Sequence, residues 1–197
     1  ESSGKQGYEI AIALNKLGIK TTLITGPTNL VSPKGLRVKK IISADEMLNE
    51  VKKSLPVDLA VCAAAVADFK PLKKNKNKFK KENLDLKSIN FVKNNDILEY
   101  ISKNNQHRPR LVAGFSAETE NLTKNAISKM KKKNCDLIFA NDVSQKDSGI
   151  NSNYNKVSVI DKKGNIKIIP KNKKSFIANK IAEILLDKLL IDDRNTN

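Results

Sequence analysis

The sequence predicts an α/β fold: a three-layer, Rossmann-like sandwich around a mostly parallel sheet, with a lysine-rich flap and a C-terminal hairpin. Two observations predict it. Short apolar runs alternate with segments of helical periodicity along the chain, an order typical of helices that cover both faces of a sheet and of ligands that bind at the carboxyl ends of its strands. The length of 197 residues suits one well-buried core, so we expect a single domain over residues 1–197.

The first half of the chain predicts two helices and three strands. Residues 4–17 predict a helix with one apolar face, which Gly18 can end. The residues of that face are Ile10, Ala11, Leu14 and Leu17. Strands are expected at 20–24, 38–42 and 59–63. Ser43 and Glu46 have the spacing of a capping box, which predicts a helix that runs to about Ser54.

The second half repeats this alternation and closes with a hairpin and a helix. Residues 84–91 alternate apolar and polar side chains, and Asp96 begins a short helix. Buried strands are expected at 111–115 and 137–140, and the helix between them has the inner face Leu122, Ala126 and Met130. Residues 156–169 predict a hairpin that turns at 161–164. The closing helix is marked by Phe176, Ile177, Ile181, Ile184 and Leu185.

The net charge of +16 raises the question of a nucleic-acid or membrane partner, because 37 basic residues stand against 21 acidic ones. Most of the basic residues are lysines interleaved with asparagine, and only 5% of residues are aromatic, which leaves few rings to stack on bases. One concentration stands out, since residues 70–81 contain seven lysines and no acid. Neighbouring lysines suit a ligand with several phosphate charges; a solvated basic loop is the alternative.

Several other classes of protein find no support. No stretch reaches the roughly 20 apolar residues of a spanning helix, and no signal-peptide pattern begins the chain, so we expect a cytoplasmic protein. Cys62 and Cys135 lack metal-ligand spacing and are expected to be buried, unreactive thiols. The single histidine, His107, lies in a polar loop, which argues against histidine-dependent acid–base chemistry.

Polar or small residues follow three of the predicted strands. These segments are 64–68, 114–119 and 140–144. If the strands are neighbours in a parallel sheet, the three segments face one cleft. Residues 2–7 precede the first helix, whose free amides and partial charge of about half a unit can hold a phosphate. The glycine pair in that segment lacks the full dinucleotide spacing, so a simple turn remains the alternative.

Six segments in order resemble phosphopantothenoylcysteine synthetase, the coenzyme A pathway ligase that in many bacteria is the C-terminal half of a bifunctional protein. They are 2–7, 64–68, 78–81, 94–98, 114–121, and 140–144 followed by Gly149 and Asn151. Two departures are visible: Gln6 stands where the family usually has methionine, and Asn95 where it usually has proline. Neither position needs its side chain for chemistry.

The resemblance implies a two-step ligation. The carboxylate of 4'-phosphopantothenate attacks the α-phosphate of CTP to give an acyl-cytidylate and pyrophosphate, and the amine of L-cysteine then displaces CMP. Lysines, backbone amides and Mg²⁺ can stabilise the charge that develops. The resemblance also implies a homodimer with the flap and hairpin near the contact. The preference for CTP over ATP and the oligomeric state stay open.

The resemblance assigns a catalytic role to Lys78, on a flap over residues 69–83 that closes over the substrates. Lys80 and Lys81 support it. Asp68 matches an acid that contacts the nucleotide in some members and phosphopantothenate in others. Backbone contacts to the pantothenate part match Ala64 and Ala65.

The remaining matches are contacts to the nucleotide. They are Ser2, Gly4, Gly7, Asn95, Asp96, Ile97, Leu98, Phe115, Lys129, Lys133 and Asn141. Without the resemblance, Phe115 is a core residue, the lysine pair is the solvated side of a helix, and Asn141 is a turn former. The metal ligands are unknown.

The family begins this domain with another strand, a glycine-rich turn, an arginine that reaches the neighbouring subunit, and an asparagine just before Glu1. The chain is therefore expected to lack its first strand and loop, and to bind nucleotide without completing the cysteine step. A decarboxylase domain with FMN would lie upstream.

Two other classes of function stay open. One is a basic nucleic-acid-binding α/β module, whose binding would fall steeply with salt. The other is a generic nucleotide-binding Rossmann domain, although the Gly-x-Gly-x-x-Gly fingerprint is absent.

Overall fold

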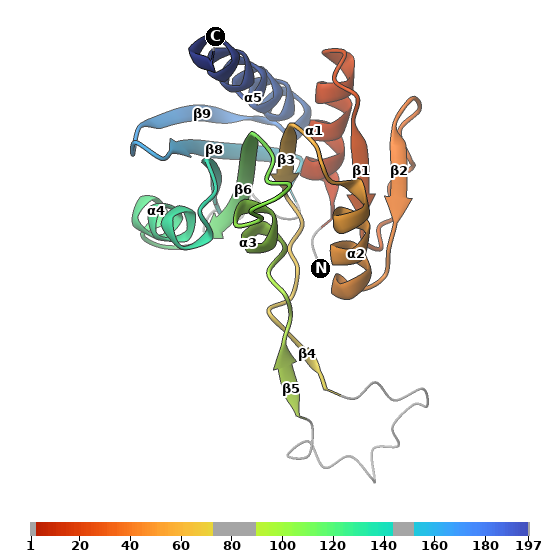
Figure 1. Ribbon diagram of the computed structural model, residues 1–197. Coiled ribbons are helices and arrows are strands. Elements are labelled where there is room, and N and C mark those ends of the chain that lie inside the picture. Colours follow the sequence, from red (N-terminus) through yellow and green to blue (C-terminus); the bar gives the residue numbers. More distant parts are fainter. Residues whose placement is uncertain (1–2, 73–89, 144–151, 197) are drawn as a thin grey trace.

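The computed structural model describes residues 3–72, 90–143 and 152–196, and it has helices on both faces of a central sheet (Figure 1). The helices are α1 (Lys5–Lys16), α2 (Ala44–Ser54), α3 (Ile97–Ser102), α4 (Leu122–Lys133) and α5 (Lys174–Thr196). The strands are β1 (Thr22–Thr25), β2 (Arg37–Lys40), β3 (Leu59–Cys62), β4 (Phe69–Pro71), β5 (Phe91–Lys93), β6 (Leu111–Glu118), β7 (Leu137–Asp142), β8 (Tyr154–Asp161) and β9 (Ile166–Lys173). The predicted α/β class is confirmed.

The central sheet has five strands in the order β3-β6-β7-β8-β9. β3, β6 and β7 are parallel to one another. β8 and β9 continue the sheet as an antiparallel hairpin, in which Gly164 takes a left-handed φ of 82° at the turn. The parallel half of the sheet is the part that gathers carboxyl strand ends at one edge.

Two smaller sheets lie beside the central one. β1 and β2 form a parallel pair of their own, next to α1 in Figure 1, and do not hydrogen-bond to β3. β4 and β5 form an antiparallel ribbon that projects from the body (Figure 1). The first two predicted strands therefore lie outside the central sheet, because no described strand bridges β1 and β2 to β3.

The core lies in two layers, one on each face of the central sheet. Alternate residues of β7 supply both: Leu137 and Phe139 pack with α1 and α5, whereas Ile138 and Ala140 pack with α2, α3 and α4. All four are no more than 1% exposed. This period-two burial is what a strand covered on both faces requires.

Local signals fix the helix ends as predicted. The Ser43 hydroxyl accepts a hydrogen bond from the backbone N–H of Glu46 at 3.3 Å, which caps α2. The Asp96 carboxylate accepts from the N–H of Glu99 at 2.8 Å, which caps α3. Gly18 follows α1 with a φ of 80°, a conformation that suits glycine.

The apolar residues that mark α5 are not all buried. Ile177, Ile181 and Leu185 are fully buried, but Phe176 is 40% exposed. The buried residues recur every four positions, so Phe176 lies about 100° around the helix from Ile177. Its ring instead lies 6.0 Å from the ammonium of Lys180.

Two strands run further than expected. β6 continues three residues past Phe115 to Glu118, and β7 continues to Asp142. The extension arises because Ala117 pairs with Asn141 and Glu118 with Asp142. Phe115 and Asn141 therefore lie within strands and not in the loops after them. Among the described residues, no helix is long and apolar enough to cross a membrane.

Candidate functional site

The three segments expected to form one rim do follow neighbouring strands. β6 pairs with β3 on one side, where Cys62 is opposite Gly114, and with β7 on the other, where Ala117 is opposite Asn141. All three strands are parallel, so their carboxyl ends share one edge of the sheet. We call this edge the carboxyl rim.

The N-terminus of α1 lies at the carboxyl rim. A Cβ atom added to Gly7 would be 3.7 Å from the Cβ of Ala63, directly after β3. Gly4 caps the helix with a φ of 71° and no side-chain hydrogen bond of its own, and the Lys5 N–H donates to the Ser3 hydroxyl at 3.5 Å. Gly4 and Gly7 are thus placed where phosphate contacts were expected; Ser2 lies outside the described residues.

The segment after β3 leads from the rim to the ribbon. Ala64, Ala65 and Asp68 are all exposed, as binding residues must be. The Asp68 carbonyl accepts a hydrogen bond from the Asn94 N–H at 2.7 Å, and the Asn94 side-chain amide donates to the Ala67 carbonyl at 2.8 Å. These bonds hold Asp68 beside the turn that leads into α3.

The start of α3 combines an exposed residue with two buried ones. Asn95 is exposed and the Asp96 carboxylate caps the helix. Ile97 and Leu98 are each only 8% exposed and pack in the core. The Leu98 side chain packs onto Gly114 of β6, so neither side chain is free to contact a nucleotide.

The two lysines of α4 already have partners. The Lys129 ammonium donates to the Phe115 carbonyl at 2.8 Å. The Lys133 ammonium lies 2.7 Å from an Asp96 oxygen and 2.9 Å from a Glu99 oxygen. An incoming phosphate would have to share these cations with the protein.

The charges of this cluster are strongly coupled. Hydrogen bonds from Lys103 and Lys133 hold the pKa of Glu99 at about 2, below its ordinary value of 4.5. Burial acts to lower the pKa of Lys133, but the hydrogen bonds that its ammonium donates to the carboxylates of Asp96 and Glu99 outweigh it and raise that pKa. Glu99 and Lys133 therefore both stay ionised near neutral pH, and their ion pair ties α3 to α4.

The sheet separates the expected nucleotide contacts into two groups. The Phe115 ring packs on Phe139 with centroids 5.2 Å apart, on the α1 and α5 side. Asn141 follows Phe139 by two positions and faces the same side. Lys129 and Lys133 lie on the α4 side, so only a ligand that crosses the carboxyl rim could contact both groups.

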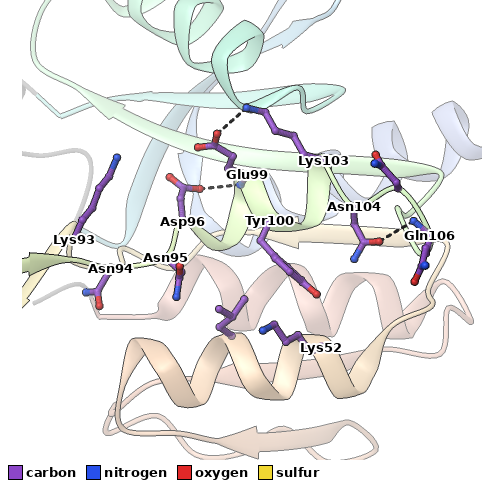
Figure 2. Close-up of a pocket in the computed structure, with 12 residues that line it drawn as sticks. Lys52, Lys93, Asn94, Asn95, Asp96, Glu99, Tyr100, Lys103, Asn104 and Gln106 are labelled. Carbon is purple, nitrogen blue, oxygen red and sulfur yellow. Dashed lines mark hydrogen bonds and ion pairs between the residues drawn. The ribbon is translucent and has the colours of Figure 1, made fainter.

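An open groove of about 770 Å³ lies between α2 and α3 (Figure 2). Asn94, Asn95 and Asp96 of the segment 94–98 line it, together with residues that sequence reasoning missed: Leu48, Lys52, Lys93, Glu99, Tyr100, Lys103, Asn104, Asn105 and Gln106. In Figure 2 the Lys52 side chain faces Tyr100 across the groove, and its ammonium is 5.2 Å from the ring centroid. No local pattern marks this groove, because it depends on how α2 packs beside α3.

The ribbon of β4 and β5 is anchored to α2. The Lys70 ammonium donates to the Asp45 carboxylate at 2.6 Å. On the opposite face of the ribbon, Phe69 is 61% and Phe91 62% exposed. The residues of the expected flap beyond Leu72, including Lys78, Lys80 and Lys81, lie outside the described part of the chain.

The cysteines and the histidine take no part in this site. Desolvation raises the pKa of the Cys62 thiol to about 12 and that of Cys135 to about 11, which keeps both protonated and poorly nucleophilic. His107 is exposed in a loop, and its backbone N–H donates to Asn104. The described residues contain no cluster of three or more His, Cys, Asp or Glu side chains that could hold a metal ion.

Comparison with known proteins gives a consistent result. The model of a family described as the DNA/pantothenate metabolism flavoprotein C-terminal domain matches residues 1–189. The Coenzyme A biosynthesis bifunctional protein CoaBC of Borreliella burgdorferi is 41% identical over 186 residues, which are 93% of this chain and 46% of that protein. The CoaBC protein of Escherichia coli is 36% identical over 98% of this chain and 48% of its own length. The chain thus spans about half the length of these relatives.

Solved structures share the fold. The crystal structure of the C-terminal domain of a CoaBC protein superposes with a TM-score of 0.78 at 30% identity, over 98% of this chain and 85% of that one. A Cab2 mutant in complex with phosphopantothenate-cysteine gives a TM-score of 0.71 over 98% of this chain and 81% of its own. That second likeness is only 12% identical and establishes the fold alone.

Proposed function

The chain belongs to the family of DNA/pantothenate metabolism flavoprotein C-terminal domains, and on that premise we propose that it joins 4'-phosphopantothenate to L-cysteine in coenzyme A biosynthesis. It would do so as the ligase part of a longer bifunctional cytoplasmic protein whose upstream decarboxylase domain holds FMN. The observation that carries the proposal is the carboxyl rim, where segments far apart in the sequence follow adjacent parallel strands beside the N-terminus of α1.

The proposed reaction has two steps. The phosphopantothenate carboxylate attacks the α-phosphate of CTP, a phosphorus–oxygen bond forms, and pyrophosphate leaves. The amine of cysteine then attacks the acyl carbon, loses a proton to form the amide, and expels CMP. Both steps develop negative charge on oxygen, which preorganised cations and amides stabilise.

The described residues can divide this work between them. The exposed backbone at Asn95 and the capped start of α3 would hold the base and ribose, and Lys129 and Lys133 would approach the phosphates from α4. The backbone amides at the start of α1, near Gly4 and Gly7, can donate to phosphate oxygens. Ala64 and Ala65, both exposed, suit the pantothenate part, and we assign Lys78 to formation of the acyl-cytidylate.

Mg²⁺ fits this site as a companion of the nucleotide. Mg²⁺ in nucleotide sites usually keeps several waters and uses one or two carboxylates besides substrate phosphates. The exposed carboxylate of Asp68, next to the rim, can be such a ligand. When bound, the ion would neutralise part of the triphosphate charge.

Two further features belong to the proposal. A strand that precedes α1 would fit between β1 and β3, which are edge strands of separate sheets. A homodimer would cover the exposed Phe69 and Phe91 of the ribbon. The asparagine expected just before Glu1 would then complete the cysteine step.

The test is a coupled assay on the complete bifunctional protein. It should release pyrophosphate only when phosphopantothenate, CTP and Mg²⁺ are all present, and form the amide only when cysteine is added. The chain of 197 residues alone should bind CTP. Absence of nucleotide-dependent release, with salt-sensitive binding of an oligonucleotide instead, would favour a basic nucleic-acid-binding module.

A further inference from the structure

We infer that Lys5 and Lys174 form a phosphate-binding subsite at the carboxyl rim, between the N-termini of α1 and α5. The inference deepens the proposed function and rests on it, because the proposed substrates carry a triphosphate and a phosphate monoester. Neither lysine was among the residues expected from the sequence.

The two lysines begin two helices whose N-termini are tied together. Lys5 is the first residue of α1 and Lys174 the first of α5. Asn153 bridges them: its side-chain oxygen accepts from the Lys5 ammonium at 2.7 Å, and its backbone carbonyl accepts from the Lys174 N–H at 2.9 Å. The Gln6 side-chain amide adds a contact of 3.5 Å to the Lys174 carbonyl.

Strand register places this pair at the same edge of the sheet as the other expected contacts. β9 ends at Lys173, which pairs with Tyr154 at the start of β8. The start of the antiparallel β8 lies beside the end of β7, since Val157 pairs with Asn141. Lys174 therefore lies at the carboxyl rim, on the sheet face that α1 and α5 cover.

The local charge is unusual for helix N-termini. The first turns of α1 and α5 contain no acidic residue, although acids are the side chains that a helix N-terminus favours. Each helix instead begins with a lysine, and Lys174 is only 4% exposed. Burial and the nearby charge of Lys5 both lower the pKa of Lys174. Two helix N-termini and two lysines of like charge thus lie close together, an arrangement that a phosphate would stabilise.

A second polar group points to a ligand at this face. The side-chain oxygen of Asn141 is buried and has no hydrogen-bond partner among the described residues. Burying such a group unsatisfied is costly. Because the two ends of an amide exchange by rotation, Asn141 can present either an acceptor or a donor to a bound substrate.

The experiment measures binding of three probes to this chain at fixed ionic strength: tripolyphosphate, CTP and 4'-phosphopantothenate. Lys174→Gln and Lys5→Gln should each weaken the probe that uses the subsite by about tenfold or more, as expected for loss of a charge-assisted contact. Lys16→Gln removes the same charge from the other end of α1 and should change each affinity by less than about twofold.

The pattern of losses identifies the phosphate source. Weaker binding of tripolyphosphate and CTP assigns the subsite to the triphosphate, and weaker binding of phosphopantothenate alone assigns it to the monoester. If Lys174→Gln does not fold, Lys174→Met keeps the buried stem and Lys5→Gln tests the subsite from the other helix. Unchanged affinities in the folded variants, or no binding of any probe to the unmodified chain, would overturn the inference.

A spectroscopic measurement gives an independent check. The bound phosphate should raise the pKa of Lys174, which NMR titration of the lysine side chains can follow. If the complete protein lacks ligase activity while this pKa still responds to tripolyphosphate, the proposed function fails and the subsite stands. If ligation is normal and neither lysine affects any probe, the subsite fails and the function stands.

Discussion

Replacing Gly114 by alanine should destabilise the protein, although alanine usually improves a strand. A Cβ at this position would be 2.6 Å from a terminal methyl of Leu98 and 3.1 Å from one of Ile138. The gain from removing a glycine is about 0.5–1 kcal/mol, whereas overpacking a core costs about 1–3 kcal/mol. The net expectation is a loss of about 0.5–2 kcal/mol of unfolding free energy, or a fall in Tm of about 2–4 °C per kcal/mol lost.

The assay is urea denaturation followed by circular dichroism, with Leu98→Ala as the second arm of a double-mutant cycle. Leu98→Ala alone should cost about 2–5 kcal/mol. In that background the added methyl fills the vacated space, so the double variant should be more stable than the sum predicts by about 1 kcal/mol or more. Gly26→Ala is the control, because its Cβ would meet only Ile41 at 4.0 Å. Additive effects, or a Gly114→Ala variant as stable as the control, would refute the packing argument.

Three other outcomes are expected. Ser43→Ala removes the cap of α2 and should lower the free energy of unfolding by about 1 kcal/mol in urea denaturation; no loss would mean that the bond to Glu46 is unimportant. Lys133→Gln should raise the pKa of Glu99 from about 2 toward its ordinary 4.5, measured by NMR titration. Because a lowered carboxylate pKa stabilises the fold above pH 4.5 and that stabilisation is lost as pH falls toward 2, the variant should lose less stability over this interval, and an identical acid profile would contradict the coupling. Lys78→Gln should slow pyrophosphate formation more than it weakens CTP binding, and an unchanged rate would remove this lysine from the mechanism.

Local signals in the sequence were sufficient where a few neighbouring residues decide the outcome. Ser43 and Asp96 cap their helices because the cap and its amide partner lie three positions apart in the chain. The carboxyl rim was predictable for a similar reason, since the apolar runs of β6 and β7 mark strands buried on both faces, and such strands are parallel in an α/β fold. The apolar run of β3 joins them at the edge of the sheet, where its residues are half-buried.

Contacts between helices and strands that are far apart in the sequence could not be predicted from it. Lys133 was expected on the solvated side of α4 or at a nucleotide, and its bonds to Asp96 and Glu99 depend on how α3 packs against α4. The groove beside Tyr100 depends on the position of α2 in the same way. Strand alternation places Phe115 on the α1 and α5 side, whereas Lys129 lies on the other side because α4 packs against that face of the sheet.

The hydrogen bonds of Asn94 have a mechanical consequence. The Asn94 side chain donates to the Ala67 carbonyl, and its backbone N–H donates to the Asp68 carbonyl. Asn94 lies two positions before Asp96, the cap of α3. These hydrogen bonds therefore connect the base of the ribbon directly to the first turn of α3. A rotation of the ribbon relative to the central sheet must therefore either break these hydrogen bonds or move the start of α3 with it.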